Sequence, residues 1–169
     1  MLTLVTISLI IALVYIGAML HLFGVTGSIS ETCYCLSTLG PMKKLGGLSP
    51  SMFFSLFCFG VAATLVVPWT SIAEGYEFCS VFACGGLAFI GAAPFFKQDL
   101  EGKVHYISAA ILGILSQIWV IFGAGLWYIS IPLFIGAFLI AKKHRNLMYW
   151  VEIAIMVSTY IAIYVKYIF

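Results

Sequence analysis

Long apolar runs separated by short polar segments make up most of the chain. Six of these runs are roughly twenty residues long, the length that an α-helix needs to cross the hydrocarbon core of a bilayer. Strands of a membrane barrel would instead alternate apolar and polar residues over roughly ten positions. The pattern predicts an all-α, polytopic membrane fold, a single domain over 1–169 with spans at about 2–23, 50–67, 78–96, 104–122, 124–141 and 147–167.

The composition agrees with a membrane location. Of 169 residues, 63% are hydrophobic and 8% are charged, and the mean hydropathy is +1.15. A soluble domain carries about 25% charged residues, so a buried core alone does not explain this composition. The net charge of +2 is small, and the Lys and Arg residues are spread over several loops. These features indicate that membrane lipids, and not nucleic acid, are the partners.

Basic residues gather on one side of the predicted bundle. Six spans place alternate connections on opposite sides, so that one side carries seven Lys and Arg residues and the other carries one. Because basic loops stay in the cytoplasm, we expect extracytoplasmic N- and C-termini in a plasma membrane, the inner membrane of a bacterium. The seven are Lys43, Lys44, Lys97, Lys103, Lys142, Lys143 and Arg145, and the single one is Lys166.

The connection "TGSISETCYCLSTLGP" between the first two runs carries a helix signal of its own. Ser28 and Glu31 match an S-x-x-E capping box, in which the Ser hydroxyl accepts a backbone N–H and the Glu reaches back to the N–H of the cap residue. Gly40 followed by Pro41 ends such a helix. We therefore expect a short interfacial helix at about 29–39. Capping alone would explain Glu31, and a role in a site is the other interpretation.

Polar side chains on the cytoplasmic side form the candidate binding site. Ionisable residues near lipid are costly unless they are paired or functional, which makes Glu152 in the last span the main intramembrane candidate. Gln117 is the deepest strongly polar residue of the fourth span, where bonding between helices competes with ligand binding. The candidate ligand-binding residues are Ser30, Glu31, Asp99, His105, Gln117 and Glu152.

A metal site is the alternative use of the same side. His21, His105 and His144 all fall there, and neutral imidazoles are zinc ligands. Each histidine is equally explained as an interfacial polar residue. The five cysteines contain no CxxC pair and are expected to serve in packing. We therefore expect no cofactor, with zinc at the three histidines as the alternative.

Two short motifs resemble the six-span DRAM-like family, which joins autophagy modulators and glycolipid-anchor remodelling proteins. "SISET" follows the first span, and an Asp-containing loop leads into "VHYISAA" at the fourth. The family has an "ISDTG"-type loop and an Asp followed by a His at these places. Here Glu31 replaces the Asp, Cys33 replaces the Gly, and the basic residues imply the reverse orientation. The matching residues are Ile29, Ser30, Glu31, Thr32, Asp99 and His105.

The resemblance implies six helices and a Ser/Glu–Asp/His constellation on one side. The chain also looks like small bacterial and phage membrane proteins with the same loops. A second likeness is chemical, because three His, an Asp and a Ser at one membrane face are similar to zinc-dependent ceramidase and progestin-receptor-like hydrolases. In those enzymes the metal activates a water. This chain lacks their HxxxH pair and has six predicted spans where they have seven.

Three function classes follow. We favour binding or translocation of a lipid headgroup, small solute or ion through a cytoplasm-facing polar pocket. The alternatives are a metal-dependent lipid hydrolase and a homo-oligomeric pore or structural subunit. Small residues motivate the last class, and they also predict that the third and fourth spans pack together. These residues are Gly85, Gly86, Gly91 and Ala92 in the third span and Ala109, Gly113 and Ser116 in the fourth.

Overall fold

The computed structural model describes residues 1–38 and 49–169. Within them the fold is all-α, as predicted, with seven α-helices and no strand. A 3-10 turn, η2 (Ala93–Phe95), follows the fourth helix, and a π turn, η3 (Trp119–Gly123), follows the fifth. The helices are α1 (Leu2–Phe23), α2 (Thr32–Thr38), α3 (Pro50–Thr70), α4 (Glu77–Ala92), α5 (Gln98–Ile118), α6 (Trp127–His144) and α7 (Leu147–Ile168).

Five helices are long and apolar enough to cross a membrane. They are α1, α3, α4 with η2, α5 from Leu100 through η3, and α7. Helix α6 is outside this set, because its 18 residues include Pro132 and end in Lys142, Lys143 and His144. Five of the six predicted spans therefore have the expected character, and the crossing by α6 stays a prediction.

Two segments that lie between the predicted spans, and were therefore expected to be loops, are largely helical. The "KQDLEGK" segment belongs to α5 from Gln98 onward, and α6 continues through the two lysines to His144. Lys, Gln and Glu are good helix formers, so a helix continues past the point where its apolar run stops. Basic side chains in the last turn of α6 also suit the negative end of the helix dipole. The short helix likewise begins later than predicted, at Thr32, while residue 39 lies outside the described residues.

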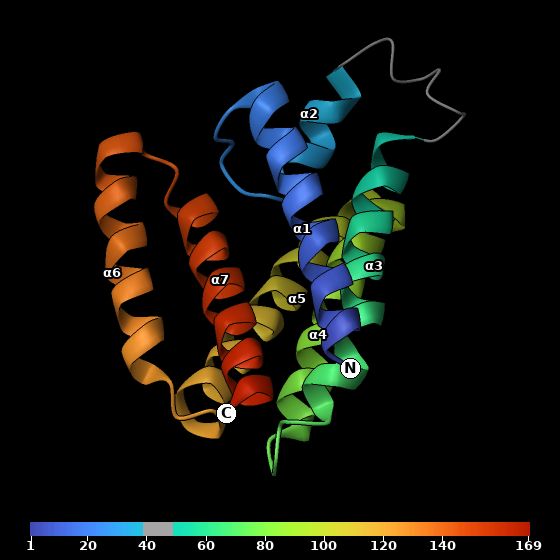
Figure 1. Ribbon diagram of the computed structural model, residues 1–169. Helices are drawn as coiled ribbons and strands as arrows, with labels where there is room; N and C mark the ends of the chain where they lie inside the picture. Colours follow the sequence, from blue (N-terminus) through green and yellow to red (C-terminus); the bar gives the residue numbers. More distant parts are fainter. Residues whose placement is uncertain (39–48) are drawn as a thin grey trace.

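Both chain termini lie at one end of the bundle, which we call the terminal end (Figure 1). Helix α2 and the α6–α7 connection lie at the opposite end, the α2 end. Helix α6 packs beside α7 and stands apart from α3 and α4 (Figure 1). Its buried residues are the small Ser130, Ala137 and Ala141, which share one helix face. The α6–α7 hairpin is therefore held mainly through α7.

The terminal end contains the main core. Trp69 of α3 and Trp119 of η3 are fully buried and meet edge to face, with ring centroids 5.3 Å apart. Three tyrosines of α7 add hydrogen bonds to other helices. The Tyr160 hydroxyl pairs with Ser8 at 2.6 Å, Tyr164 pairs with Thr6 at 3.0 Å, and Tyr167 donates to the Pro68 carbonyl at 2.7 Å. Because no water competes within a bilayer, such bonds fix how α1, α3 and α7 pack.

Glycines of α4 allow close approach on two sides. A Cβ at Gly86 would lie 2.8 Å from the Ser108 carbonyl oxygen of α5, which confirms the predicted packing of the third and fourth spans. A Cβ at Gly91 would lie 2.6 Å from the Cys58 Cβ of α3, so this glycine serves a different neighbour. Ala109, Gly113 and Ser116 of α5 line a cavity whose walls include both α4 and α7, and Ala109 also packs against the small cluster that contains Ile90 of α4.

Candidate functional site

An irregular segment, Gly24–Glu31, which we call the arm and which ends in a turn at Ile29–Glu31, lies against the start of α7. The Asn146 side-chain amide donates to the Val25 carbonyl at 2.9 Å, and the Tyr149 N–H donates to the Gly27 carbonyl at 3.2 Å. The Ile29 N–H donates to the Glu152 carboxylate at 2.6 Å. Val25, Gly27 and Ile29 thus contact Asn146, Tyr149 and Glu152, which are spaced three residues apart and so lie on one side of the start of α7. The Tyr149 N–H belongs to the first helical turn, whose N–H groups lack partners within the helix.

Glu31 turns back onto the arm. The Ser28 hydroxyl accepts the Glu31 N–H at 3.1 Å, as the capping box predicted. The Glu31 carboxylate accepts the N–H of Gly27 at 2.5 Å, one residue before the expected partner. The box therefore closes a turn that precedes α2. The Glu31 side chain stays exposed and also lines the polar cavity described below.

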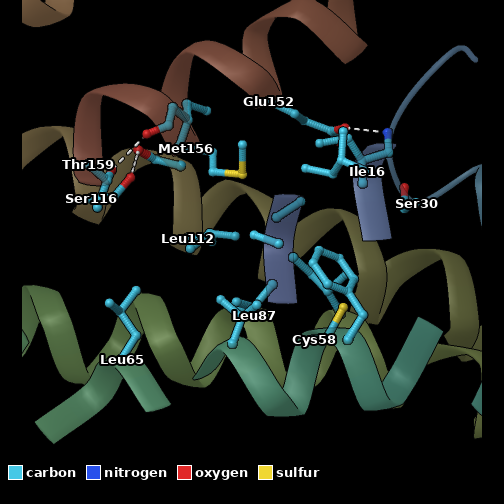
Figure 2. Close-up of a pocket in the computed structure, with 18 of the residues that line it drawn as sticks. Ile16, Ser30, Cys58, Leu65, Leu87, Leu112, Ser116, Glu152, Met156 and Thr159 are labelled. Carbon is cyan, nitrogen blue, oxygen red and sulfur yellow. Dashed lines mark hydrogen bonds between the residues drawn. The ribbon is translucent and has the colours of Figure 1, made fainter. Parts of the chain in front are cut away.

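An apolar cavity of about 150 Å³ runs through the bundle from the arm toward Trp69. Its walls come from α1, α3, α4, α5 and α7, with the aliphatic side chains of Ile16, Leu87, Leu112 and Met156 prominent among them (Figure 2). Glu152 occupies the end nearest the arm, where a dashed line in Figure 2 joins its carboxylate to a backbone nitrogen. Ser116 and Thr159 add hydroxyls elsewhere in the wall, but they donate to carbonyls of their own helices. Glu152 is thus the single acidic residue among the described lining residues.

A second, more polar cavity of about 290 Å³ lies beside α2. Its described lining includes the hydroxyls of Ser28 and Ser30, the Glu31 carboxylate and the rings of Tyr34 and Tyr106. Ala93 and Pro94 of η2 and Gly102 of α5 complete the wall on the other side. The cavity therefore joins the arm and α2 to the start of α5.

Ser30, Phe54 and His105 line both cavities. Phe54 is 2% exposed and belongs to a small core cluster with Cys33, Cys58 and Ile90. His105 is partly buried, and its ring meets the Tyr106 ring edge to face at 5.7 Å. These three side chains form a junction between an apolar space and a polar space. The sequence predicted two of the three, and Phe54 looked like one more apolar residue of a span.

Helix α2 is fixed to α5 by a hydrogen bond from the Tyr34 hydroxyl to the Glu101 carboxylate. This bond is the main reason that the pKa of Tyr34 is raised to about 12, so the hydroxyl stays protonated at neutral pH. Burial raises the pKa of the Cys33 thiol to about 11, which leaves it as an unreactive packing group. Sequence reasoning missed Tyr34, Tyr106 and Glu101. The available signal was that one tyrosine lies three residues after Glu31 and the other directly after His105.

Gln117 lies outside both cavities and connects three helices. Its side-chain amide donates to Ser158 of α7 at 3.1 Å, and its carbonyl oxygen accepts from Ser130 of α6 at 2.6 Å. Hydrogen bonding between helices was the alternative to ligand binding that the sequence left open for Gln117. Gln117 therefore holds the α6–α7 hairpin against α5 and does not contribute to the candidate site.

The three histidines, which were the candidate metal ligands, do not form a common site. His21 and His144 are exposed, and neither lines a cavity with His105. Among the side chains that the structure describes, no three His, Cys, Asp or Glu residues come together in a group that would hold a metal. The Asp99 side chain lies outside the described residues. The structure thus brings together Ser30, Glu31, His105 and Glu152 around the two cavities.

Comparison of the chain with protein-family models, with curated proteins and with solved structures gave no match, so the DRAM-like resemblance stays a prediction.

Proposed function

We propose that this protein binds a single-chain amphiphile, with the acyl or alkyl chain in the apolar cavity and the headgroup in the polar cavity. The observation that carries the proposal is the junction at Ser30, Phe54 and His105, where the two cavities share their walls. A headgroup and a chain are joined covalently, so their sites must adjoin. Together the cavities reach the lower part of the roughly 300–1,000 Å³ range of ligand pockets.

The cavity sizes favour one short or partly inserted chain. An apolar cavity of about 150 Å³ suffices for a ligand the size of benzene, so it holds only part of a typical acyl chain. The serine hydroxyls, the Glu31 carboxylate and His105 supply the hydrogen bonds that a headgroup needs. Glu152 keeps the arm in place and so positions Ser30 at the junction.

The proposal includes the finer topology. All six long helices cross the membrane, α2 lies at the cytoplasmic interface and both termini are extracytoplasmic. Support comes from the basic residues of the α2 end and from the shared end of the two termini (Figure 1). Alkaline phosphatase and green fluorescent protein fused in turn to the C-terminus test it. The proposal expects phosphatase activity without fluorescence, and the opposite result overturns the orientation.

Self-association stays a prediction. Gly86 and Gly91 are among the small residues that suggested a homo-oligomer interface, and in the structure they contact other helices of the same chain.

Photolabelling tests the binding itself. The protein in nanodiscs is irradiated with lysophosphatidylcholine that carries a diazirine at the end of its chain, and the labelled peptides are mapped by mass spectrometry. The proposal expects labels on cavity residues such as Leu112 and Met156, which disappear when unlabelled lysophosphatidylcholine is in excess. Labels confined to exposed residues such as Phe138 and Leu139, and insensitive to competitor, would contradict it.

A further inference from the structure

The charge of the polar cavity indicates which headgroup it accepts. Among the described residues that line it, none is Lys or Arg, and Glu31 is the single carboxylate. Within the described part of the chain, Glu31 has no ion pair, and the hydrogen bond from Gly27 leaves its negative charge uncompensated. An anionic group entering this space would meet the Glu31 carboxylate, which has no cationic partner among the described residues. A cationic group would gain the attraction of opposite charges.

Aromatic rings surround the same space. Phe54, Tyr34 and Tyr106 all line the cavity, and the two tyrosines are largely exposed, so they lie where it opens. The face of an aromatic ring carries partial negative charge and attracts ammonium groups, including quaternary ones, within about 6 Å of the ring centre. Three rings and a carboxylate around one cavity are the chemical surroundings that suit such a group.

We infer that the polar cavity selects amphiphiles whose headgroup carries an ammonium group, such as choline or ethanolamine lipids. This inference rests on the proposed amphiphile binding and adds headgroup selectivity to it. Glu31 supplies the opposite charge, and Tyr34, Tyr106 and Phe54 supply the ring faces. The hydroxyls of Ser28 and Ser30 accept hydrogen bonds from a primary ammonium and are compatible with a methylated one.

Two lysolipids that differ only in headgroup test the inference. Lysophosphatidylcholine and lysophosphatidylglycerol with the same chain share the phosphate, so a difference in affinity reports on the terminal group. Binding to the full protein in nanodiscs is followed by native mass spectrometry over a titration. We expect the choline lipid to bind roughly tenfold more tightly, which corresponds to about 1.4 kcal/mol.

Matched variants locate the source of the preference. Glu31→Gln should reduce the ratio of affinities at least roughly threefold, because the charge is lost while an acceptor for the Gly27 N–H remains. Glu74→Gln removes the same charge from the loop before α4 at the other end of the bundle and should leave the ratio unchanged. Tyr106→Leu should lower the ratio, whereas Tyr128→Leu, an exposed ring on α6, should not. Circular dichroism and a single elution peak verify that each variant is folded.

The outcomes separate the two levels of the proposal. Equal binding of the two lysolipids, or a preference unchanged by both Glu31→Gln and Tyr106→Leu, overturns the ammonium inference and leaves the amphiphile site standing. Absence of saturable binding for either lysolipid overturns the proposed function together with the inference.

Discussion

The terminal end and the α2 end of the bundle are built from the same long helices but differ in how tightly their side chains pack. At the terminal end, two tryptophans, Val120 and Ile163 are fully buried, and tyrosine hydroxyls of α7 hydrogen-bond to α1 and α3. At the α2 end lie the polar cavity and the part of the lining around Glu152, from which the apolar cavity extends toward Trp69. There the carboxylate of Glu152 accepts the backbone N–H of Ile29 in the arm. The comparison indicates that packing at the terminal end stabilises the fold, while the α2 end retains cavity space and polar side chains that a ligand can contact.

The largest expected contrast is between two isoleucines. Ile163 is fully buried in the main core, whereas Ile16 lines the apolar cavity. Ile163→Ala should lower the free energy of unfolding by about 2–5 kcal/mol, because it creates a void in tight packing. Ile16→Ala should cost at least about 1 kcal/mol less, because fewer contacts are lost where space already exists. Unfolding in mixed micelles measures both, and equal losses would contradict the comparison.

Neighbouring glycines of α4 sharpen the account of helix packing. A Cβ at Gly86 would collide with the backbone of α5, while a Cβ at Gly85 meets nothing within 4 Å. Gly86→Ala should therefore destabilise the protein by about 1–3 kcal/mol. Gly85→Ala is the control and should be neutral or stabilising by up to about 1 kcal/mol, because alanine favours helix. Thermal unfolding of the two variants decides, and a reversed order would refute this packing.

Glu152 tests whether the arm is held by side-chain chemistry. Glu152→Ala removes the acceptor of the Ile29 N–H, which should reduce the local stability of the arm by about 1–3 kcal/mol. Hydrogen exchange of the arm should accelerate, while exchange at the end of α7 near Ile163 stays unchanged. Glu152→Gln keeps a carbonyl acceptor and should accelerate exchange less. Unchanged exchange in the alanine variant would mean that the other two arm contacts suffice.

The smallest effect is expected at the hydroxyl pair of Ser8 and Tyr160. The two oxygens are 2.6 Å apart and lie within the terminal end. Hydrogen bonds between membrane helices contribute about 0.6 kcal/mol on average. A double-mutant cycle of Ser8→Ala and Tyr160→Phe should give a coupling energy near this value. A coupling energy near zero would show that these hydroxyls fit the packing without stabilising it.

Hydropathy predicted the positions of the long helices well, because a helix long enough to cross a bilayer needs an apolar run of matching length, and such runs are visible in the sequence. It failed at Gln98–Lys103 and at Lys142–His144, where the helix outlasts its apolar run. Charged residues with high helix propensity continue a helix beyond its apolar part. The sequence therefore located the apolar part of each long helix better than its ends.

The candidate site was predictable in part. Glu31 and Glu152 stood out because charges are rare in this chain, and the capping box gave the first contact of Glu31. The bond between Glu152 and Ile29 joins residues 123 positions apart and depends on how the arm crosses α7. Phe54 could not be singled out, because a phenylalanine in an apolar run carries no signal for a cavity wall.

The central claim is that the apolar and polar cavities hold one ligand, and two adjacent alanines test it most directly. Ala109 lines the apolar cavity, whereas Ala110 is exposed. Lysophosphatidylcholine binding to Ala109→Leu and Ala110→Leu is measured in nanodiscs by native mass spectrometry. The account predicts that Ala109→Leu fills the cavity and loses saturable binding, while Ala110→Leu binds like the unmodified protein. Equal binding by the two variants would contradict it.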